Sequence, residues 1–267
     1  MRRVSFRGLT RDVEVDISDP SSEVAVVIAA MMASWRKPRG DAPPVRYQLT
    51  CGPRPTVTRD GVDLGPIAEE LDLIAIFEGD LYRKMPALAD HAWVLHGAGL
   101  VIDGAATVLV GPSGAGKSTT TLGALIAGAG YLSDEQLAID SAGRVTGARR
   151  PLAFDPAPII EPPPSFRRVR YPIRRGGARV EDLLYVPPAA QLRYEAPLAR
   201  LVALRHAPDE PPGLRAIASG EAFTRIWSQS LATSHELLAL ATSLAARVEL
   251  VELVTRDVAG AARDLGL

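Results

Sequence analysis

Hydrophobic and polar positions alternate in short segments over the N-terminal third of the chain. Three segments follow the period of a half-buried strand: residues 11–17 (RDVEVDI), 45–50 (VRYQLT) and 56–64 (TVTRDGVDL). The Asp60-Gly61 pair would fold the last of them on itself. Residues 21–35 predict a helix capped by serine, and apolar residues recur at helical spacing over residues 67–81. Residues 1–90 therefore predict a small α/β lobe.

A second α/β unit is predicted over residues 91–267. Residues 91–111 read as two strands joined by the turn dipeptide Asp103-Gly104. A helix would begin at Lys117 and end near Gly128, and a short strand would follow at residues 131–133. The remaining pattern predicts a hairpin around residues 141–143, a strand at 198–205, helices at 220–232 and 234–246, a strand at 248–254 and a last short helix.

Residues 156–164 are rich in proline and lead into a stretch rich in arginine that extends to Arg179. The prolines predict an irregular connection, and the charges predict a solvated, mobile loop. Arginine forks also bind phosphates and carboxylates, so an alternative is a segment that orders over a phosphate or an acidic acceptor when substrate arrives. The arginines concerned are Arg149, Arg150, Arg167, Arg168, Arg170, Arg174 and Arg175.

Composition narrows the class of protein. With 267 residues, 47% of them hydrophobic, the chain is typical of a soluble globular protein, and its net charge of −1 disfavours nucleic acid or an anionic membrane as a partner. The longest apolar run, residues 24–33, is too short to cross a bilayer and follows acidic rather than basic residues, unlike a signal peptide. The single cysteine, Cys51, suits a reducing cytoplasm.

The sequence GPSGAGKS at residues 111–118 follows an apolar strand and precedes a helix, the context in which G-x-x-x-x-G-K-[ST] binds a nucleoside triphosphate. Glycines let successive backbone N–H groups surround a phosphate at a helix N-terminus. Lys117 would bridge the β- and γ-phosphates, and the Ser118 hydroxyl would bind Mg²⁺. The sequence thus predicts a site for a triphosphate with Mg²⁺.

Asp134 and Glu135 follow the short strand predicted at residues 131–133. A right-handed crossover would make that strand run parallel to the strand before the glycine loop, so both would open toward the phosphates. One acid could then accept the proton of an attacking hydroxyl while the other holds Mg²⁺. The alternative is that Asp134 and Glu135 only begin a solvated turn and have no role in a reaction.

These motifs resemble the catalytic domain of the HPr kinase/phosphorylase family, and still more its shorter HPr kinase-like relatives. The resemblance rests on Leu95-His96-Gly97, the hairpin that follows, GPSGAGKS and YLSDE at residues 131–135. It implies a P-loop kinase core of the type shared with ATP-dependent phosphoenolpyruvate carboxykinases, following a small N-terminal α/β lobe. It also implies ATP and Mg²⁺ as cofactors, phosphoryl transfer to a serine hydroxyl, and assembly into a homo-oligomer.

The resemblance also implies roles for particular residues. Asp134, Lys117 and His96 would act in catalysis, and Ser118, Glu135 and Asp134 would lie around the metal. The nucleotide would contact Gly111, Ser113, Gly114, Ala115, Gly116, Lys117, Ser118 and Thr119. From the residues alone, His96 is equally well explained as a structural histidine, and His91, His206 and His235 lack metal-like spacing.

The chain departs from HPr kinases at Thr119, where they usually carry Glu, and in having Asp-Glu in place of Asp-Asp. Glu161 is the single candidate for their C-terminal metal-site glutamate. Short relatives associated with peptide-modifying gene clusters, including those of lasso peptides, fit better and imply a serine on a peptide or protein as acceptor. A small-molecule hydroxyl kinase, a nucleotide-switched ATPase or binding protein, and a scaffold without turnover remain alternatives.

Overall fold

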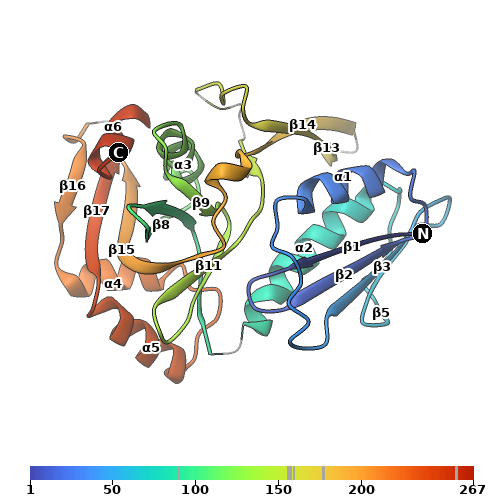
Figure 1. Cartoon of the computed structure of the whole chain (residues 1–267), viewed down its shortest axis with the longest axis horizontal. Helices are drawn as coiled ribbons and strands as arrows, with labels where there is room; N and C mark the ends of the chain where they lie inside the picture. Colours follow the sequence, from blue (N-terminus) through green and yellow to red (C-terminus); the bar gives the residue numbers. More distant parts are fainter. Residues whose placement is uncertain (90, 155–157, 159, 176–177, 208, 256–257) are drawn as a thin grey trace.

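The described residues form three β-sheets and six α-helices (Figure 1). In this computed structural model they are residues 1–89, 91–154, 158, 160–175, 178–207, 209–255 and 258–267, with only the backbone described at 173–175 and 258–259. Residue 90, at the predicted domain boundary, and Pro156, in the predicted proline-rich connection, lie outside them. No helix within these ranges is both long and apolar enough to cross a membrane.

The N-terminal sheet has the strand order β1-β2-β3-β4-β5, in which β2 and β3 are parallel and the other neighbours antiparallel. Its strands are β1 (Arg2–Arg7), β2 (Asp12–Ile17), β3 (Val45–Thr50), β4 (Thr56–Arg59) and β5 (Val62–Asp63). Along β3, Val45, Tyr47 and Leu49 are buried and the residues between them exposed. One face of the sheet is therefore covered, and α1 (Glu23–Met32) and α2 (Asp72–Leu88) cover it.

The sequence predicted β2, β3, the β4–β5 turn and α1 correctly. Asp60 and Gly61 have φ values of 50° and 81°, as a two-residue hairpin turn requires, and the Ser22 hydroxyl caps α1 by accepting from the backbone N–H of Ala25. Strand β1 was not anticipated, because its three arginines obscure the alternation that buries Phe6. Helix α2 begins at Asp72, later than the apolar pattern suggested, and continues to Leu88.

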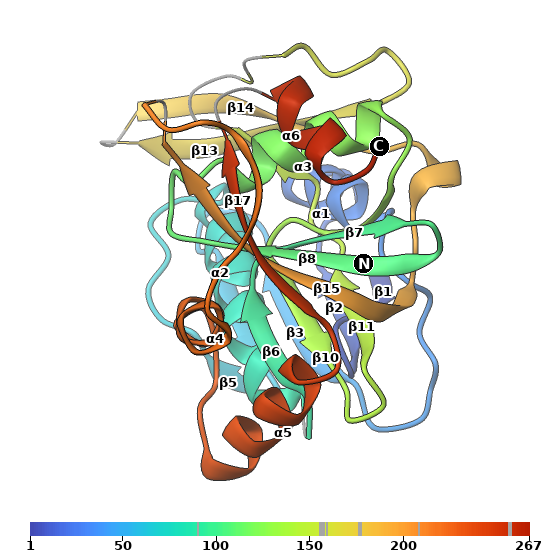
Figure 2. The same ribbon diagram turned by 90° about the vertical axis from the view of Figure 1, so that its left-hand side faces the viewer.

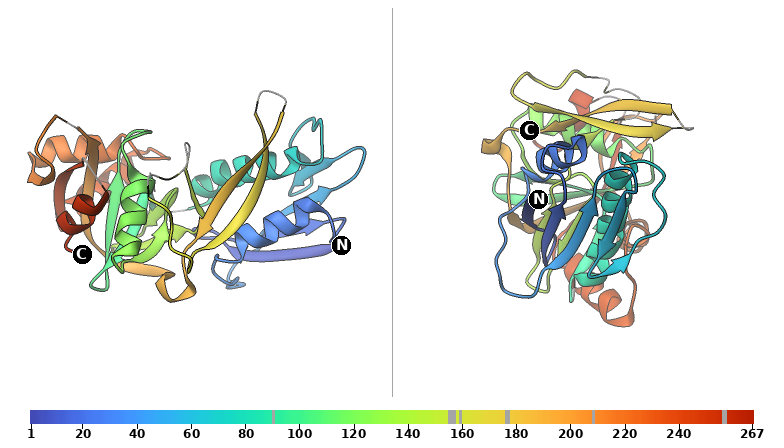
Figure 3. Two further views of the ribbon diagram at one scale, coloured as in Figure 1. Left: turned by 90° about the horizontal axis from the view of Figure 1, so that it is seen from above. Right: turned by 90° about the vertical axis from the view of Figure 1, so that its right-hand side faces the viewer.

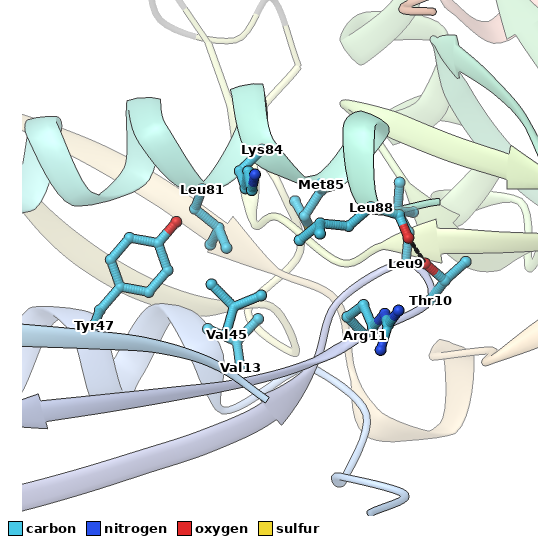
Figure 4. Close-up of a pocket in the computed structure, with 10 residues that line it drawn as sticks. All are labelled: Leu9, Thr10, Arg11, Val13, Val45, Tyr47, Leu81, Lys84, Met85 and Leu88. Atoms are coloured by element: carbon cyan, nitrogen blue, oxygen red, sulfur yellow. Dashed lines mark hydrogen bonds between the residues drawn. The ribbon is translucent and has the colours of Figure 1, made fainter. Parts of the chain in front are cut away.

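Figure 4 shows the space between α2 and the sheet. Leu81 and Met85 project from the helix toward Val13 and Val45 on the strands, and the cavity they enclose measures about 10 Å³. That volume is close to the least a water molecule needs. The space is therefore core packing, as predicted for the apolar stripe of this helix.

The second sheet has nine strands, with β15 at its centre. Its strands are β6 (Trp93–His96), β7 (Ala98–Ile102), β8 (Ala105–Val110), β9 (Gly130–Ser133), β10 (Gln136–Ile139), β11 (Arg144–Ala148), β15 (Glu195–His206), β16 (Gly213–Ala216) and β17 (Glu249–Thr255). The main path runs β6-β10-β11-β15-β8-β7-β9, and β17 pairs with both β15 and β16. Strands β8, β15 and β17 are parallel, so their carboxyl ends lie at one edge.

Helices cover both faces of this sheet (Figure 2). The four helices are α3 (Lys117–Ile126), α4 (Ser219–Trp227), α5 (His235–Ala245) and α6 (Val258–Asp264). Successive residues of β8 divide between two cores: Leu109 packs with the apolar residues of α3 and α6, whereas Val108 and Val110 pack with those of α4 and α5. The glycine loop thus lies at the edge of a sheet that is buried on both sides.

Most of the sequence expectations for this sheet are confirmed, and two are refined. Asp103 and Gly104, with φ values of 50° and 81°, make the predicted turn between β7 and β8. The strand expected before that turn is two strands, β6 and β7, separated at Gly97. Strand β9 runs in the same direction as β8, as predicted, but β7 lies between them and is antiparallel to both. Strand β16 was not anticipated, and α4 ends at Trp227, before the predicted position.

The arginine-rich stretch is a strand, so the prediction of a solvated loop is wrong. A three-stranded sheet contains β12 (Leu152–Ala153), β13 (Arg167–Arg175) and β14 (Ala178–Val186), and a short 3₁₀ helix, η1 (Ala189–Gln191), follows it. Val169 and Tyr171 alternate with exposed arginines and are buried, and β13 contacts α1 and α2. The β13–β14 hairpin extends from the second sheet across the helices of the N-terminal one (Figure 3). The side chains of Arg174 and Arg175 lie outside the described residues.

Candidate functional site

The loop at residues 111–118 connects β8 to α3 and needs glycine at three positions. A Cβ atom on Gly111 would lie 2.6 Å from the backbone oxygen of Leu204 on the neighbouring strand β15. Gly114 and Gly116 have φ values of 79° and 94°, which side-chain-bearing residues rarely adopt, and Gly116 is the N-cap of α3. The loop therefore turns sharply against the sheet and directs the first N–H groups of α3 into the space above it.

Lys117 and Ser118 begin α3 and lie on the side of the loop that faces β9. The Lys117 ammonium donates to the backbone oxygens of Gly111 (2.7 Å) and Pro112 (3.2 Å). Burial lowers its pKa, and the negative charges of Asp134 and Glu135 oppose that shift. Ser118 is half-buried and lies beside Asp134, where its hydroxyl lowers the pKa of that carboxyl group. The charges of the loop and of the acidic pair are thus close enough to affect each other's pKa values.

Ser133, the last residue of β9, shapes the turn that carries the acidic pair. Its hydroxyl donates to the backbone oxygen of Ala148 (2.5 Å) and accepts from the N–H groups of Glu135 (3.1 Å) and Gln136 (3.2 Å). Strand β11 approaches closely because Gly147 has no side chain: a Cβ there would lie 2.1 Å from the Leu132 oxygen. These contacts fix the backbone of the two acids at the end of β9.

Asp134 has a buried oxygen without a partner. The residue as a whole is half-buried, but its Oδ1 is shielded from solvent and accepts no hydrogen bond from the residues that the structure describes. Burial raises the pKa of Asp134 to about 7; the charge of Glu135 adds to the rise, and the Ser118 hydroxyl and the cations Arg150 and Lys117 oppose it. A carboxyl group with that pKa can take up and release a proton near neutral pH.

Glu135 is the opposite case, because both of its oxygens have partners. Its Oε1 lies 3.5 Å from Nδ1 of His96, and its Oε2 accepts from Arg150 at 3.1 Å. Burial would raise the pKa of Glu135, but the hydrogen bond from His96 and the charge of Arg150 outweigh it and lower the pKa. His96 lies at the end of β6, and its ring also contacts the backbone oxygen of Glu135 at 3.1 Å. Glu135 therefore stays ionised.

Most of the predicted site residues line one cleft of about 460 Å³. They are His96, Ser113, Gly114, Gly116, Lys117, Ser118, Thr119, Asp134 and Glu135. Gly111 and Ala115 instead line a second cleft, of about 570 Å³, between the loop, the end of β15 and α4. The first cleft also contains Arg150, one of the arginines named above as a candidate to bind phosphate or an acidic acceptor. Phe154 and Pro158 line it as well, and the sequence analysis did not name them as site residues.

The other sequence candidates lie elsewhere. Arg149 donates to the backbone oxygens of Ser34 and Arg193, and its guanidinium stacks 3.9 Å from the centre of the Tyr194 ring, so its role is structural. Exposed Glu161 pairs with Arg168, and neither lines the cleft. Among the described residues, no three His, Cys, Asp or Glu side chains form a metal-binding group.

The chemistry of this cleft fits a triphosphate with a hard divalent cation. The loop offers backbone donors at a helix N-terminus and one lysine, and Ser118 and the acidic pair offer hydroxyl and carboxylate oxygens, the ligands that Mg²⁺ prefers. Among the described residues no donor reaches the buried Oδ1 of Asp134, as expected where a ligand supplies one. Because protein groups are few, phosphate and water would complete the cation's ligands.

Comparisons with known proteins give a distant likeness to solved structures. No protein-family model and no curated protein matches the chain. Solved structures that match include the HPr(Ser) kinase/phosphatase from Coxiella burnetii, which is 13% identical, with 61% of this chain and 84% of that chain covered and a TM-score of 0.30. The likeness is too distant to assign an activity or a site residue to this chain.

Proposed function

We propose that this protein is a P-loop kinase of the HPr kinase-like type, which transfers the γ-phosphoryl group of ATP to a serine hydroxyl of a peptide or protein. The observation that carries the proposal is the cleft in which the glycine loop, Lys117 and Ser118 meet Asp134, a carboxylate with a pKa near 7 and an unpartnered oxygen. The proposal takes residues 91–267 as the kinase core and residues 1–90 as an added lobe. It assigns the protein to the cytoplasm.

In this proposal the loop binds and orients the phosphates. Backbone N–H groups of residues 113–118 donate to phosphate oxygens, and Lys117 exchanges its contacts with the Gly111 and Pro112 oxygens for contacts with the phosphates. Ser118 and Glu135 would hold the Mg²⁺ ion, and His96 keeps Glu135 in position through its ring nitrogen. When bound, Mg-ATP supplies the phosphoryl group, and the metal ion offsets part of its charge.

Asp134 acts as the general base. The acceptor hydroxyl approaches the free Oδ1 and transfers its proton to that oxygen as the hydroxyl oxygen forms a bond to the γ-phosphorus of ATP. The bond between that phosphorus and the β–γ bridging oxygen breaks in the same step, and ADP leaves. The raised pKa suits this task, because the carboxylate then binds the proton well enough to take it and is still largely ionised above pH 7. The division of roles follows from the contacts: Glu135 pairs with Arg150 and lies beside the His96 ring, and Asp134 is left for the substrate.

The test is incubation with γ-labelled ATP, Mg²⁺ and candidate acceptors, followed by mass spectrometry of each product. A gain of one phosphate on a serine of a peptide or protein, formed about 100-fold more slowly with Asp134→Asn, supports the proposal. Label on a small alcohol would indicate a small-molecule kinase instead. Release of free phosphate alone, with every acceptor unmodified, would overturn the proposal in favour of a nucleotide-switched ATPase.

A further inference from the structure

Arg150 connects two carboxylates that are far apart in sequence. Its Nε donates to Oε1 of Glu78 at 2.8 Å, and another guanidinium nitrogen donates to Oε2 of Glu135 at 3.1 Å. Glu78 belongs to α2 in the N-terminal region and is 5% exposed, whereas Glu135 follows β9 in the candidate site. One guanidinium thus ties the helix that covers the N-terminal sheet to the acidic pair beside the glycine loop.

Further contacts hold this guanidinium and its partner in place. The Tyr171 hydroxyl, on β13, donates to the second oxygen of Glu78, so three separate elements meet at one buried carboxylate. The Tyr131 hydroxyl donates to the backbone oxygen of Arg150, and the Arg150 guanidinium lies 5.7 Å from the centre of the Tyr82 ring. Arg150 therefore has little freedom to leave Glu135 while Glu78 remains in place.

We propose that Arg150 is a positioning residue, held by Glu78, which Tyr171 holds in turn, and that it fixes Glu135 in the site so that Asp134 alone faces the acceptor. The catalytic role that this inference gives to the contacts rests on the proposed function. A planar fork can bridge two carboxylates, whereas a lysine at the same position offers a single ammonium. In this arrangement the N-terminal region and the β13–β14 hairpin complete the site, although none of their described residues lines the cleft.

A purely structural role is the competing explanation, because any buried carboxylate needs a partner. The same helix provides a matched control. Asp80, two residues after Glu78, is 8% exposed and accepts from Arg59 at 2.6 Å and from the Tyr47 hydroxyl at 2.9 Å. Both acids lie on α2 with one arginine and one tyrosine partner, but the contacts of Asp80 stay within the N-terminal region.

The kinetic test compares Glu78→Gln with Asp80→Asn. We expect Glu78→Gln to lower kcat about 10- to 100-fold, the range seen when supporting contacts of a site are removed, with KM for ATP changed less than about twofold. Arg150→Lys should show the same loss, since it retains the charge without the fork. Asp80→Asn should retain kcat per folded molecule, even if both variants lose stability. Equal kcat for Glu78→Gln and Asp80→Asn would overturn the proposal.

A second measurement does not depend on activity. Amide hydrogen exchange over residues 131–137, without nucleotide, reports on the turn that Ser133 fixes. Glu78→Gln should speed exchange there by about tenfold, whereas Asp80→Asn should leave it unchanged. If the wild type transfers no phosphate, the proposed function fails, and the exchange result still decides whether Arg150 positions the turn. Unchanged exchange in Glu78→Gln would reject the positioning role even for an active kinase.

Discussion

Two clusters of charged side chains flank the glycine loop, and they differ in how their charges are satisfied. On the side of β9, Asp134 has an unpartnered buried oxygen and a raised pKa. On the side of α4, Arg205 and Arg225 both donate to Glu252, which is 4% exposed. Hydrogen bonds from the two arginines lower the pKa of Glu252, although burial opposes them. The pKa values of these two carboxyl groups thus shift in opposite directions.

The difference indicates that Asp134 is available to a ligand or substrate, whereas Glu252 holds secondary-structure elements together. Glu252 on β17 joins β15 and α4 through its arginines, and its charge is already compensated. Asp134 keeps an unsatisfied acceptor, which costs stability unless a ligand or substrate uses it. We therefore expect changes at the first cluster to alter turnover and changes at the second to alter stability.

Lys117→Ala should have the largest effect. It removes the single ammonium near the loop, so turnover should fall by about 10³-fold or more, because charge compensation at the transferred phosphoryl group is lost. Steady-state phosphate transfer measures this. Lys37→Ala, which removes an exposed lysine outside the cleft, is the control and should be neutral. Full turnover in Lys117→Ala would remove the site assignment altogether.

Asp134→Asn should lower kcat by about 100-fold, the scale of a general base, while ATP affinity measured by calorimetry stays within about threefold. Asp140→Asn is a suitable comparison, because Asp140 also follows a strand of the same sheet but does not line the cleft. It should leave kcat unchanged. A parallel loss of ATP affinity in Asp134→Asn would make Asp134 mainly a metal ligand.

The sequence predicted the parts of this site that depend on neighbours along the chain. The glycine loop, the Asp103-Gly104 turn and the acids after β9 all have signals within a few residues. Arg150 pairs with Glu78, 72 residues away, and no local pattern links the two. The β13 strand was missed because its arginines suggested solvent, although Val169 and Tyr171 alternate with them in the period of a strand. Which charge is paired depends on tertiary packing.

Glu252→Gln should reduce the free energy of unfolding by about 3 kcal/mol, because it leaves two guanidinium groups without their shared buried carboxylate. Turnover per folded molecule should stay within about twofold. Urea unfolding and kinetics on the same preparation separate the two effects. A large loss of kcat at normal stability would break the comparison, since the second cluster would then serve the reaction.

Stability should also depend on pH through Asp134. The folded protein holds its proton to about pH 7, whereas an unfolded aspartate has a pKa of about 3.9, so ionisation destabilises the fold progressively across that window. Without metal or nucleotide, Asp134→Asn should be more stable than the wild type at pH 8 by roughly 2 kcal/mol, after allowance for partial exposure, and no more stable at pH 4. Thermal unfolding in a chelator measures this. Equal stability at both pH values would mean that Asp134 is compensated by groups that its contacts do not reveal.

Glu221→Gln is the smallest of these changes and refines the comparison within the second cluster. Glu221 and Glu252 both accept from Arg225, but the Glu221 side chain is 53% exposed and that of Glu252 is 5% exposed. An exposed pair one helical turn apart contributes little, so the expected loss is about 0.3 kcal/mol in urea unfolding and should shrink further in high salt. A loss as large as that of Glu252→Gln would show that pairing with Arg225, rather than burial, sets the energy of these carboxylates. The contrast with Asp134 would then rest on its missing partner alone.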